Sequence, residues 1–489
     1  MDYRHGIYTR EGKTTLTTPV EGTAGLQVVF GTAPYALATS ADNPTEPKLC
    51  SGFDDAVAVL GYSDDWEKYT LCQSMDASFR AFSVAPVVFV NVLDPDNPNH
   101  VEKTTPIEAT FTEHAYTIDA AGVIASTIAV TTAASSGITL VQGTDYDVVM
   151  DNEGMTTILL LADSEHYATE TLYVAYSSMK PEAITVDDII GSYDPSTGKR
   201  TGLELLHEIY PRFGMTPGLV LAPGFTGPEL VAAVEAKCRE ISGSFVCEAV
   251  LDIPADESGA VVYTGVKDAK SKLGMDSEHI IPCWPMAKIG DKIYAMSALL
   301  SALMAQTDAE NGDVPYVSPS NKPLQAVALI LKDGTQVVLD QAQANTINSY
   351  GVVTAIAHGT IRAWGNNTAA YPENSDPKDR WIPARRMFSW VRNSIVLTYF
   401  QKVDDPMNFR LIESITDSFN IWGNSLVAAG YCAACKVRFE RSDNPDTELL
   451  NGHITFRISF SPYPPAENIE FILTFDTDAL TASIMGGDI

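Results

Sequence analysis

Hydrophobic residues near the C-terminus follow the two-residue period of a β-strand. In the segment NIEFILTFDTDALTASI, residues 468–484, apolar side chains occupy alternate positions: Ile469, Phe471, Leu473 and Phe475. This period predicts a strand with one apolar face. The preceding SPYPP, residues 461–465, contains prolines, which cannot donate to a strand ladder and favour an extended connection. The strand therefore either folds back onto a sheet of its own chain or pairs with the sheet of another molecule.

The first 98 residues predict an extended arm followed by an α/β unit. Residues 1–24 are rich in Thr and Gly and have no helical period, so they predict an N-terminal extended arm. Residues 25–98 begin with a strand pattern, GLQVVFG, continue with a short helix pattern over 51–61 and an amphipathic helix pattern over 65–82, and end in a second strand. We interpret 25–98 as the first segment of an α/β core.

The pattern changes over residues 99–180, where only strand-like runs separated by Gly, Asn and Asp remain. Between Val101 and Met179 there are eleven Asp or Glu residues but a single Lys or Arg, Lys103. Short strands at such spacing predict a small β-sandwich-like domain inserted into the core. Insertions are tolerated best at surface loops, so we expect this domain to be exposed.

Residues 181–359 predict a further α/β domain. A strand over 218–223 leads into a helix for which Thr226 and Glu229 form a potential capping box. The buried stripe of that helix is predicted to be Leu230, Val234, Cys238 and Ile241. The strand that follows completes a βαβ unit, which implies parallel pairing. A second helix is predicted over residues 291–308.

Residues 360–465 predict a C-terminal α+β domain, and residues 466–489 a C-terminal arm that carries the alternating strand. The domain is mainly helical over 385–430 and continues as a hairpin of CKVRFER with HITFRISFSPY. The whole chain is therefore expected to be a multidomain α+β or α/β protein with extended terminal arms.

The composition excludes several classes of partner. The 489 residues carry a formal net charge of −30, whereas nucleic acids and anionic membranes are bound by clustered Lys and Arg. No apolar run is long enough to span a bilayer, and residues 1–30 contain no apolar core of a signal peptide. Seven scattered cysteines are typical of a reducing cytoplasm. The acidity is compatible with simple solubility or with a basic partner.

No motif predicts a catalytic residue, a metal site or a cofactor. Gly224 and Gly227 lie between a strand and a helix, where an anion can bind, but the phosphate-loop pattern is absent and a tight turn explains them equally. Cys432 and Cys435 have the spacing of a redox motif, but they follow a helix instead of preceding one, which favours a buried structural role. The histidines are isolated, and no G-x-S-x-G elbow occurs.

One basic cluster stands out in the acidic chain. The segment DRWIPARRMFSWVRNS, residues 379–394, contains Arg380, Arg385, Arg386 and Arg392. Such a patch either docks an acidic partner through charge-assisted hydrogen bonds or pairs internally with the chain's own carboxylates. The sequence leaves both alternatives open.

The order of several motifs resembles the contractile tail sheath proteins of bacteriophages and related phage-tail-like injection systems. The resemblance covers everything except about residues 99–180, and it rests on collinear order because each motif is weak alone. The matching segments are HGIYTREG, TPVEGTAGLQVVFGTAP, SGFDDAVAVLGY, ITVDDIIG, TGLELL, LAPG, GTIRAWGNNTAA, WIPARRMFSWVRNSI, FNIWGNSLVAAGYC and LNGHITFRISFSPYPPAENIEFILTF.

The resemblance implies a structural subunit of a helical sheath that surrounds an inner tube and contracts to drive the tube through a cell envelope. The implied partners are further copies of the chain, the inner tube protein, and baseplate and tail terminator proteins, without nucleic acid or membrane insertion. The implied location is a virion or a bacteriocin-like particle, assembled in the bacterial host cytoplasm.

In that family the terminal arms of one subunit add strands to the C-terminal sheets of its neighbours. The resemblance therefore implies a donor strand made of Ile469, Phe471, Leu473 and Phe475. The N-terminal arm contacts would be Ile7, Tyr8 and Leu16. The candidate inner-tube contacts are Arg385, Arg386 and Arg392. The bodies would repack during contraction while the arms stay paired.

Two other function classes fit parts of the sequence. The alternating helices and strands are compatible with a cytoplasmic α/β hydrolase or transferase that carries a β-sandwich accessory domain. A non-contractile surface-layer or adhesive protein would also be rich in β-structure, but it should have a signal peptide. Removal of residues 466–489 separates these classes, because an enzyme should stay active whereas a sheath should stop forming tubes.

Overall fold

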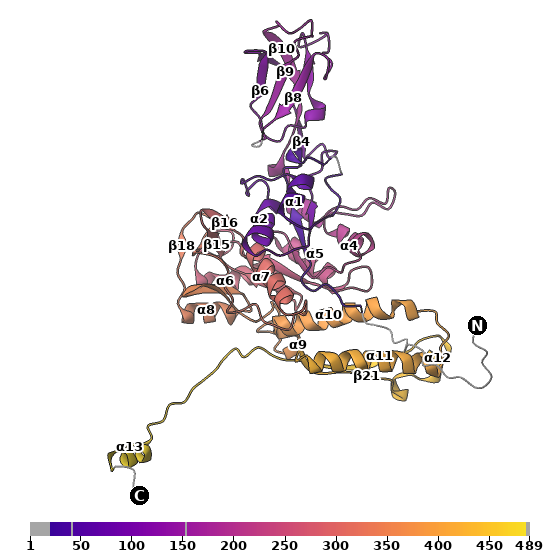
Figure 1. Cartoon of the computed structure of the whole chain (residues 1–489), viewed down its shortest axis with the longest axis vertical. Helices are drawn as coiled ribbons and strands as arrows, with labels where there is room; N and C mark the ends of the chain where they lie inside the picture. The colour runs from indigo at the N-terminus through magenta and orange to yellow at the C-terminus, as the bar shows by residue number, and fades with distance from the viewer. Residues whose placement is uncertain (1–19, 41–42, 152–153, 486–489) are drawn as a thin grey trace, which may run out of the picture.

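A computed structural model of the chain describes residues 20–40, 43–151 and 154–485. Figure 1 shows a small all-β part at one end, an α/β body in the middle, and a helical part from which the C-terminal segment departs. Helices and strands are mixed along the chain, as the sequence predicts.

The body is built on a six-stranded sheet. Its strands, in spatial order, are β14 (Ile280–Cys283), β13 (Glu248–Asp252), β12 (Leu219–Leu221), β1 (Gln27–Gly31), β3 (Val87–Asn91) and β2 (Lys48–Cys50). Neighbouring strands are parallel except β2, which is antiparallel to β3. The parallel pairing predicted for the βαβ unit is confirmed, since Leu219 lies opposite Glu248.

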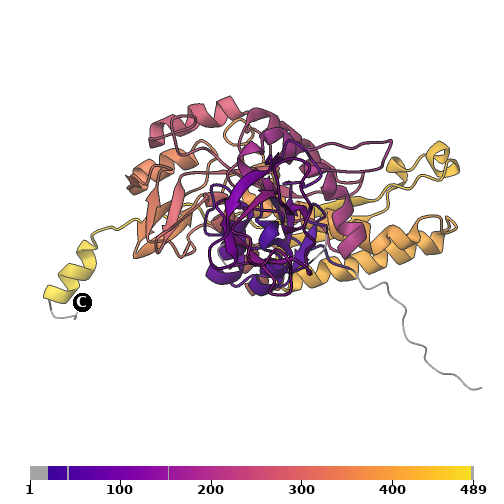
Figure 2. The ribbon, with the colours of Figure 1, turned by 90° about the horizontal axis from the view of Figure 1, so that it is seen from above.

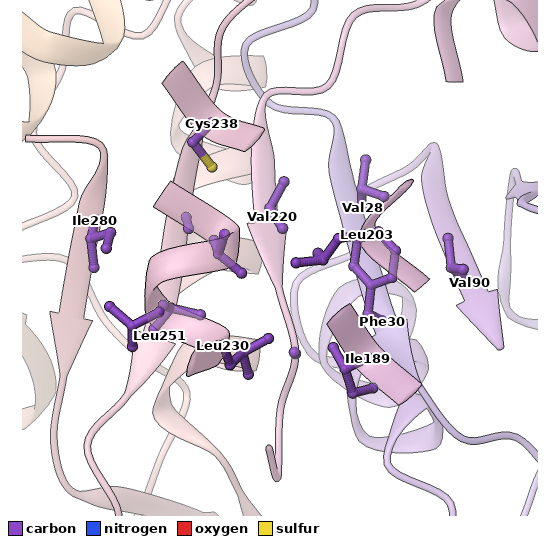
Figure 3. Packing of buried hydrophobic residues seen from close by; sticks show 14 of the residues in the cluster. Val28, Phe30, Val90, Ile189, Leu203, Val220, Leu230, Cys238, Leu251 and Ile280 are labelled. Carbon is purple, nitrogen blue, oxygen red and sulfur yellow. The ribbon is translucent and has the colours of Figure 1, made fainter. Parts of the chain in front are cut away.

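Alternate side chains of this sheet face two helical layers. Val28, Phe30 and Val220 point to one side, where they meet Leu230, Ile189 and Leu203 (Figure 3). Their neighbours Val29, Phe89 and Leu221 point to the opposite side and belong to a separate buried cluster. Both faces are covered, which explains why these strands are continuous apolar runs.

The helices of the body lie on one side or the other of the sheet. Those on the side of Val28 include α3 (Val186–Ile190), α4 (Leu206–Phe213), α5 (Pro228–Arg239) and α6 (Val266–Leu273). Those on the other side are α1 (Phe53–Leu60), α2 (Leu71–Met75) and α7 (Met296–Glu310). The predicted stripe of α5 and the residue beyond it is confirmed, because all four members are buried: Leu230, Val234, Cys238 and Ile241.

Two helix predictions were wrong in detail. The helix expected over 65–82 begins at Leu71 and continues as a π-helix over Asp76–Ala81. Its stretch 71–78 is buried on all sides and not amphipathic, because both the sheet and α7 cover it, whereas Arg80 near its end is exposed. The helix expected over 291–308 begins at Met296, since the residues before it form a hairpin strand.

The capping box predicted for α5 does not form either. Its N-cap is Gly227, and the Thr226 hydroxyl instead donates to the Asp252 carbonyl at 3.3 Å. Tertiary contact with the neighbouring strand thus replaces the local cap.

The all-β part lies within the stretch predicted as an insertion. Its neck is β4 (Val101–Lys103) paired antiparallel with β11 (Ser177–Met179). Beyond the neck are two three-stranded sheets. One consists of β5 (Ile107–Thr110), β10 (Thr171–Ala175) and β7 (Ala129–Thr131), the other of β6 (Ala115–Ile118), β9 (Thr156–Leu160) and β8 (Tyr146–Met150). They enclose a buried cluster of their own, at the top of Figure 1.

Smaller elements connect the body to the C-terminal part. They are a sheet of β15 (Met286–Ile289), β16 (Lys292–Tyr294), β17 (Ala328–Ile330) and β18 (Gln336–Val337), the helix α8 (Gln341–Asn348), and the hairpin β19 (Thr354–His358) with β20 (Thr360–Trp364). The C-terminal part contains α9 (Pro377–Arg380), α10 (Ile382–Tyr399), α11 (Phe409–Ala428), β21 (Cys432–Arg438), α12 (Asp446–Leu450), β22 (Arg457–Pro462) and α13 (Thr477–Ile484).

Candidate assembly surfaces

The C-terminal hairpin is a two-stranded sheet fixed on two helices. β21 and β22 pair antiparallel, with Arg438 opposite Arg457, so the predicted hairpin is confirmed. Cys435 and Val437 are buried on the face that packs against α11. The Phe460 ring of β22 meets the Phe388 ring of α10 with centroids 5.0 Å apart. These contacts hold the sheet rigidly against the helices.

Both strands of this hairpin have an unpaired edge within the described part of the chain. β21 and β22 are each other's only neighbours there. The outer face carries exposed polar residues such as Lys436 and Arg457. An open edge presents backbone N–H and C=O groups that can pair with a further strand. The hairpin is therefore a candidate acceptor for strands of another chain.

The segment after the hairpin leaves the body as an extended chain. Residues 463–476 contain neither helix nor strand and lead to α13, well away from the rest of the molecule in Figures 1 and 2. The four residues predicted for the donor strand are largely exposed, at 69%, 86%, 95% and 78% for Ile469, Phe471, Leu473 and Phe475. Exposed apolar residues gathered in this way mark an interaction site. In this structure the segment does not return to the chain's own sheets.

The root of this segment is attached to the body by one arginine. Arg380 Nη2 lies 3.0 Å from Glu467 Oε2, and its Nε donates to Asn367 Oδ1 at 2.8 Å. The guanidinium also stacks 3.9 Å from the centre of the Trp381 ring. A cleft of about 910 Å³ lies beside it, and residues 463–469 form part of its wall. Sequence reasoning missed this contact, because nothing local links residues 87 positions apart.

Two of the three candidate tube contacts are buried, which corrects their prediction. Arg386 is 2% exposed and forms an ion pair with Asp308, which is equally buried. Arg385 is 6% exposed and lies 3.3 Å from Asp379 Oδ1. These arginines pair internally, as the second interpretation of the cluster proposed, and present no charge at the surface. Arg392 is exposed and stays a candidate.

The residues that the sequence offered as possible sites of chemistry occupy places that fit a structural role. Cys432 and Cys435 are buried on β21, and burial raises the pKa of both thiols, that of Cys435 to about 12. Gly224 has a φ of +87°, which fits a tight turn. Among the described residues, no group of three or more His, Cys, Asp or Glu side chains could hold a metal ion. In that same part of the chain, no helix has the length and apolarity needed to cross a bilayer.

The N-terminal arm contacts lie outside the described residues. Ile7, Tyr8 and Leu16 belong to residues 1–19. The described part of that arm begins at Val20, where the backbone runs along α10.

No family model matches the chain. It is 27% identical over 488 residues to the tail sheath protein of Burkholderia phage BcepMu, covering 98% of this chain and 97% of that protein. It is 24% identical over 332 residues to the major tail sheath protein of Serratia phage KSP20, covering 65% and 78%. Among solved structures, it is similar to a chain of the contracted sheath complex of the extracellular contractile injection system PVC. That match has a TM-score of 0.57 and 14% identity, and it covers 98% of this chain and 99% of the other. At this identity the structural match shows the fold alone.

Proposed function

We propose that this chain, which belongs to the contractile tail sheath proteins of phages and phage-tail-like injection systems, polymerises through its terminal segments. The polymer is a helical sheath around an inner tube, and its contraction drives the tube into a target cell envelope. The observation that carries this proposal is the exposed C-terminal segment, which leaves the body beside a hairpin with two open edges.

The C-terminal segment of one copy adds a strand to the hairpin of the next. Backbone hydrogen bonds provide the binding, and the alternate side chains of Ile469, Phe471, Leu473 and Phe475 cover apolar surface on the acceptor. Burying such a side chain stabilises a contact by roughly 1.5–3 kcal/mol. Donor and acceptor surfaces differ, so the contact is heterologous and propagates into an open helical array.

Contraction follows from the tethered geometry. The body and the donor strand are joined by an extended, proline-containing connection, so the body can change its packing while the strand remains paired. The chain acts structurally in this proposal, without a catalytic residue or cofactor. Its partners are further copies, the inner tube, and baseplate and terminator proteins of the same particle. Arg392 is the remaining candidate for the tube contact.

The donor-strand proposal is tested by placing charge on one face of the segment. Phe471→Asp with Leu473→Asp should abolish tubes in negative-stain micrographs and leave soluble monomers, because charged side chains would be buried in the acceptor. The matched control, Ile472→Asp with Thr474→Asp, changes the opposite face and should still form tubes. Removal of residues 466–489 should act like the first variant. Tubes from the first variant or from the truncated chain would disprove the donor assignment.

A further inference from the structure

The last residues of the N-terminal arm lie along α10 in a regular ladder of hydrogen bonds. The helix side chains that contact this backbone are spaced by four residues. The bonds are Val20 N to Thr398 Oγ1 (2.9 Å), Gly22 N to Ser394 Oγ (2.9 Å), Trp390 Nε1 to Gly22 O (2.9 Å) and Arg386 Nη2 to Ala24 O (3.0 Å). The extended backbone thus runs antiparallel to the helix over three turns of α10.

The spacing of the ladder has a simple geometric origin. Four residues of an α-helix advance about 6.0 Å along its axis, and two residues of an extended chain advance about 6.6 Å. The N–H groups of Val20 and Gly22 therefore meet hydroxyls on neighbouring turns, whereas the longer side chains of Trp390 and Arg386 reach the Gly22 and Ala24 carbonyls from the next two turns. Gly22 allows the close approach, since a Cβ there would lie 3.1 Å from Asn393 Cβ.

Residues between these positions are held from other directions. The Trp422 Nε1 of α11 donates to Glu21 Oε1 at 3.2 Å, and Thr23 N donates to Thr216 Oγ1 at 3.0 Å. The segment 20–24 is consequently fixed on α10, on α11 and on the body at once. Most of these contacts use its backbone or a small side chain, so they depend little on side-chain packing by the arm itself.

A second row of α10 side chains ties the same helix to the central sheet. Asn393 accepts from Val246 N at 3.0 Å and donates to Val246 O at 2.8 Å. Ser389 Oγ donates to Glu248 Oε1, on β13, at 2.5 Å. Arg386 in addition forms its buried ion pair with Asp308 of α7. A force applied to the ladder is therefore passed to the sheet and to α7.

We propose that α10 is the mechanical anchor of the N-terminal arm, and that Ser394 and Thr398 are positioning residues which keep the base of the arm attached while the sheath contracts. This inference rests on the proposed function, because it is the neighbouring subunit that pulls on the arm. Residues 20–24 run along the helix axis, so a pull in that direction loads all rungs of the ladder in shear. A perpendicular segment would instead lose its bonds one at a time.

The ladder itself is tested by amide hydrogen exchange on the full, unassembled chain. The probe variant is Ser394→Ala with Thr398→Val. The control is Thr416→Val with Ser425→Ala, whose hydroxyls bond only to carbonyls of their own helix α11. Each lost bond should speed exchange of the Val20 and Gly22 amides about fivefold. Exchange equal to that of the wild type would overturn the ladder as the holder of the arm. Ser394→Ala alone repeats the test at Gly22 if the double variant does not fold.

The mechanical role is tested on sheaths formed by the same proteins. After shear and triggered contraction, wild-type and control sheaths should remain unbroken in micrographs, whereas sheaths of the probe variant should break into separate pieces. Unbroken sheaths from a variant whose Val20 and Gly22 amides exchange fast would overturn the anchor. If even the wild type forms no polymers, the proposed function fails and the tension role fails with it, while the exchange experiment still decides whether α10 holds the arm.

Discussion

At the scale of single residues, the best connected buried carboxylate of the body belongs to Asp76. It lies at the start of the π-helix and is 6% exposed. Three side chains donate to it: Tyr294 (2.6 Å), Arg80 (3.1 Å) and Lys292 (3.2 Å). The Tyr62 hydroxyl lies 3.2 Å away and donates to the neighbouring Asp64 at 2.9 Å. Burial alone raises the pKa of Asp76, but hydrogen bonds from Tyr294, Lys292 and Arg80 outweigh it and hold the pKa below 3.8. The network joins the π-helix to β16, so its role is to hold the body together.

Replacement of this carboxylate should destabilise the chain in a pH-dependent way. Asp76→Asn should cost about 1–3 kcal/mol near neutral pH, because the donors lose a charged acceptor. A carboxylate with a lowered pKa contributes stability above its unfolded pKa, here 3.8, and loses it as the pH falls through the folded value. Urea unfolding at pH 7 and at steps down to pH 3 measures this.

The difference between Asp76→Asn and the wild type should shrink below about pH 4. The exposed Asp96→Asn serves as the control and should show little difference at any pH. A deficit that stays constant down to pH 3 would contradict the assignment of this stability to the ionised Asp76.

At the scale of elements, the contact between α11 and β21 is close enough to require glycine. A Cβ added to Gly423 of α11 would lie 2.1 Å from the Cys435 carbonyl oxygen of β21. The neighbouring Trp422 and Phe419 rings pack edge to face, with centroids 5.5 Å apart. The position of the hairpin on the helices therefore depends on the absence of a side chain at one position.

Gly423→Ala should destabilise the C-terminal part by about 1–3 kcal/mol through overpacking. Helix propensity alone predicts the opposite sign, since Ala is favoured over Gly by about 1 kcal/mol inside a helix. Thermal unfolding followed by near-ultraviolet circular dichroism, which reports on Trp422, checks the sign. Ser425→Ala on the exposed side of α11 is the control. Stabilisation by Gly423→Ala would show that the backbone contact is looser than described.

Some features of the helices and strands could be predicted from the sequence, and others could not. The stripe of α5 and the pairing of β12 with β13 were predicted correctly, because period and chain order are local properties. The sequence could not decide between an exposed and an internally paired Arg386, because its partner Asp308 is 78 residues away. The helix over 65–82 was mistaken for amphipathic, because a helix covered on both sides contains polar residues such as Gln73 that only tertiary contacts bury.

The C-terminal segment shows a different limit of sequence reasoning. Its alternating pattern was visible, and in the structure the segment leads away from the body towards α13 once it has passed the contact with Arg380. No local signal states where its pairing partner lies, because that partner is absent from the same chain in the present proposal. For the same reason the acceptor edges of β21 and β22 were recognisable only as a hairpin. The ladder on α10 was also missed, since it joins residues more than 360 positions apart.

At the scale of the whole molecule, the all-β part is attached through a neck of two paired strands whose ends lie close together. Lys103 at the end of β4 lies opposite Ser177 at the start of β11. Opposed residues of antiparallel strands have Cα atoms about 4.5–5.5 Å apart, so a two-residue Asn-Gly turn can join them. The two sheets beyond the neck have their own buried cluster, which shares no residue with the clusters of the body.

Replacement of residues 104–176 by Asn-Gly should therefore leave a folded chain. We expect it to unfold near the wild-type midpoint and to form tubes of the same inner diameter in negative-stain micrographs, because the terminal segments and the hairpin are unchanged. Loss of polymers from a well-folded deletion variant would show that the all-β part takes part in assembly, in conflict with an exposed position.

A longer deletion tests whether the neck itself is needed, or whether the chain tolerates any deletion in this region. Met179 is 6% exposed and belongs to the main buried cluster of the body, where the Tyr35 hydroxyl lies 3.6 Å from its sulfur. Removal of residues 101–179 takes this side chain away with the neck, and loss of a buried Met typically costs 2–5 kcal/mol. The longer deletion should unfold at lower denaturant concentration than the shorter one. Equal stability would mean that the boundary of the body lies after Met179 and not before it.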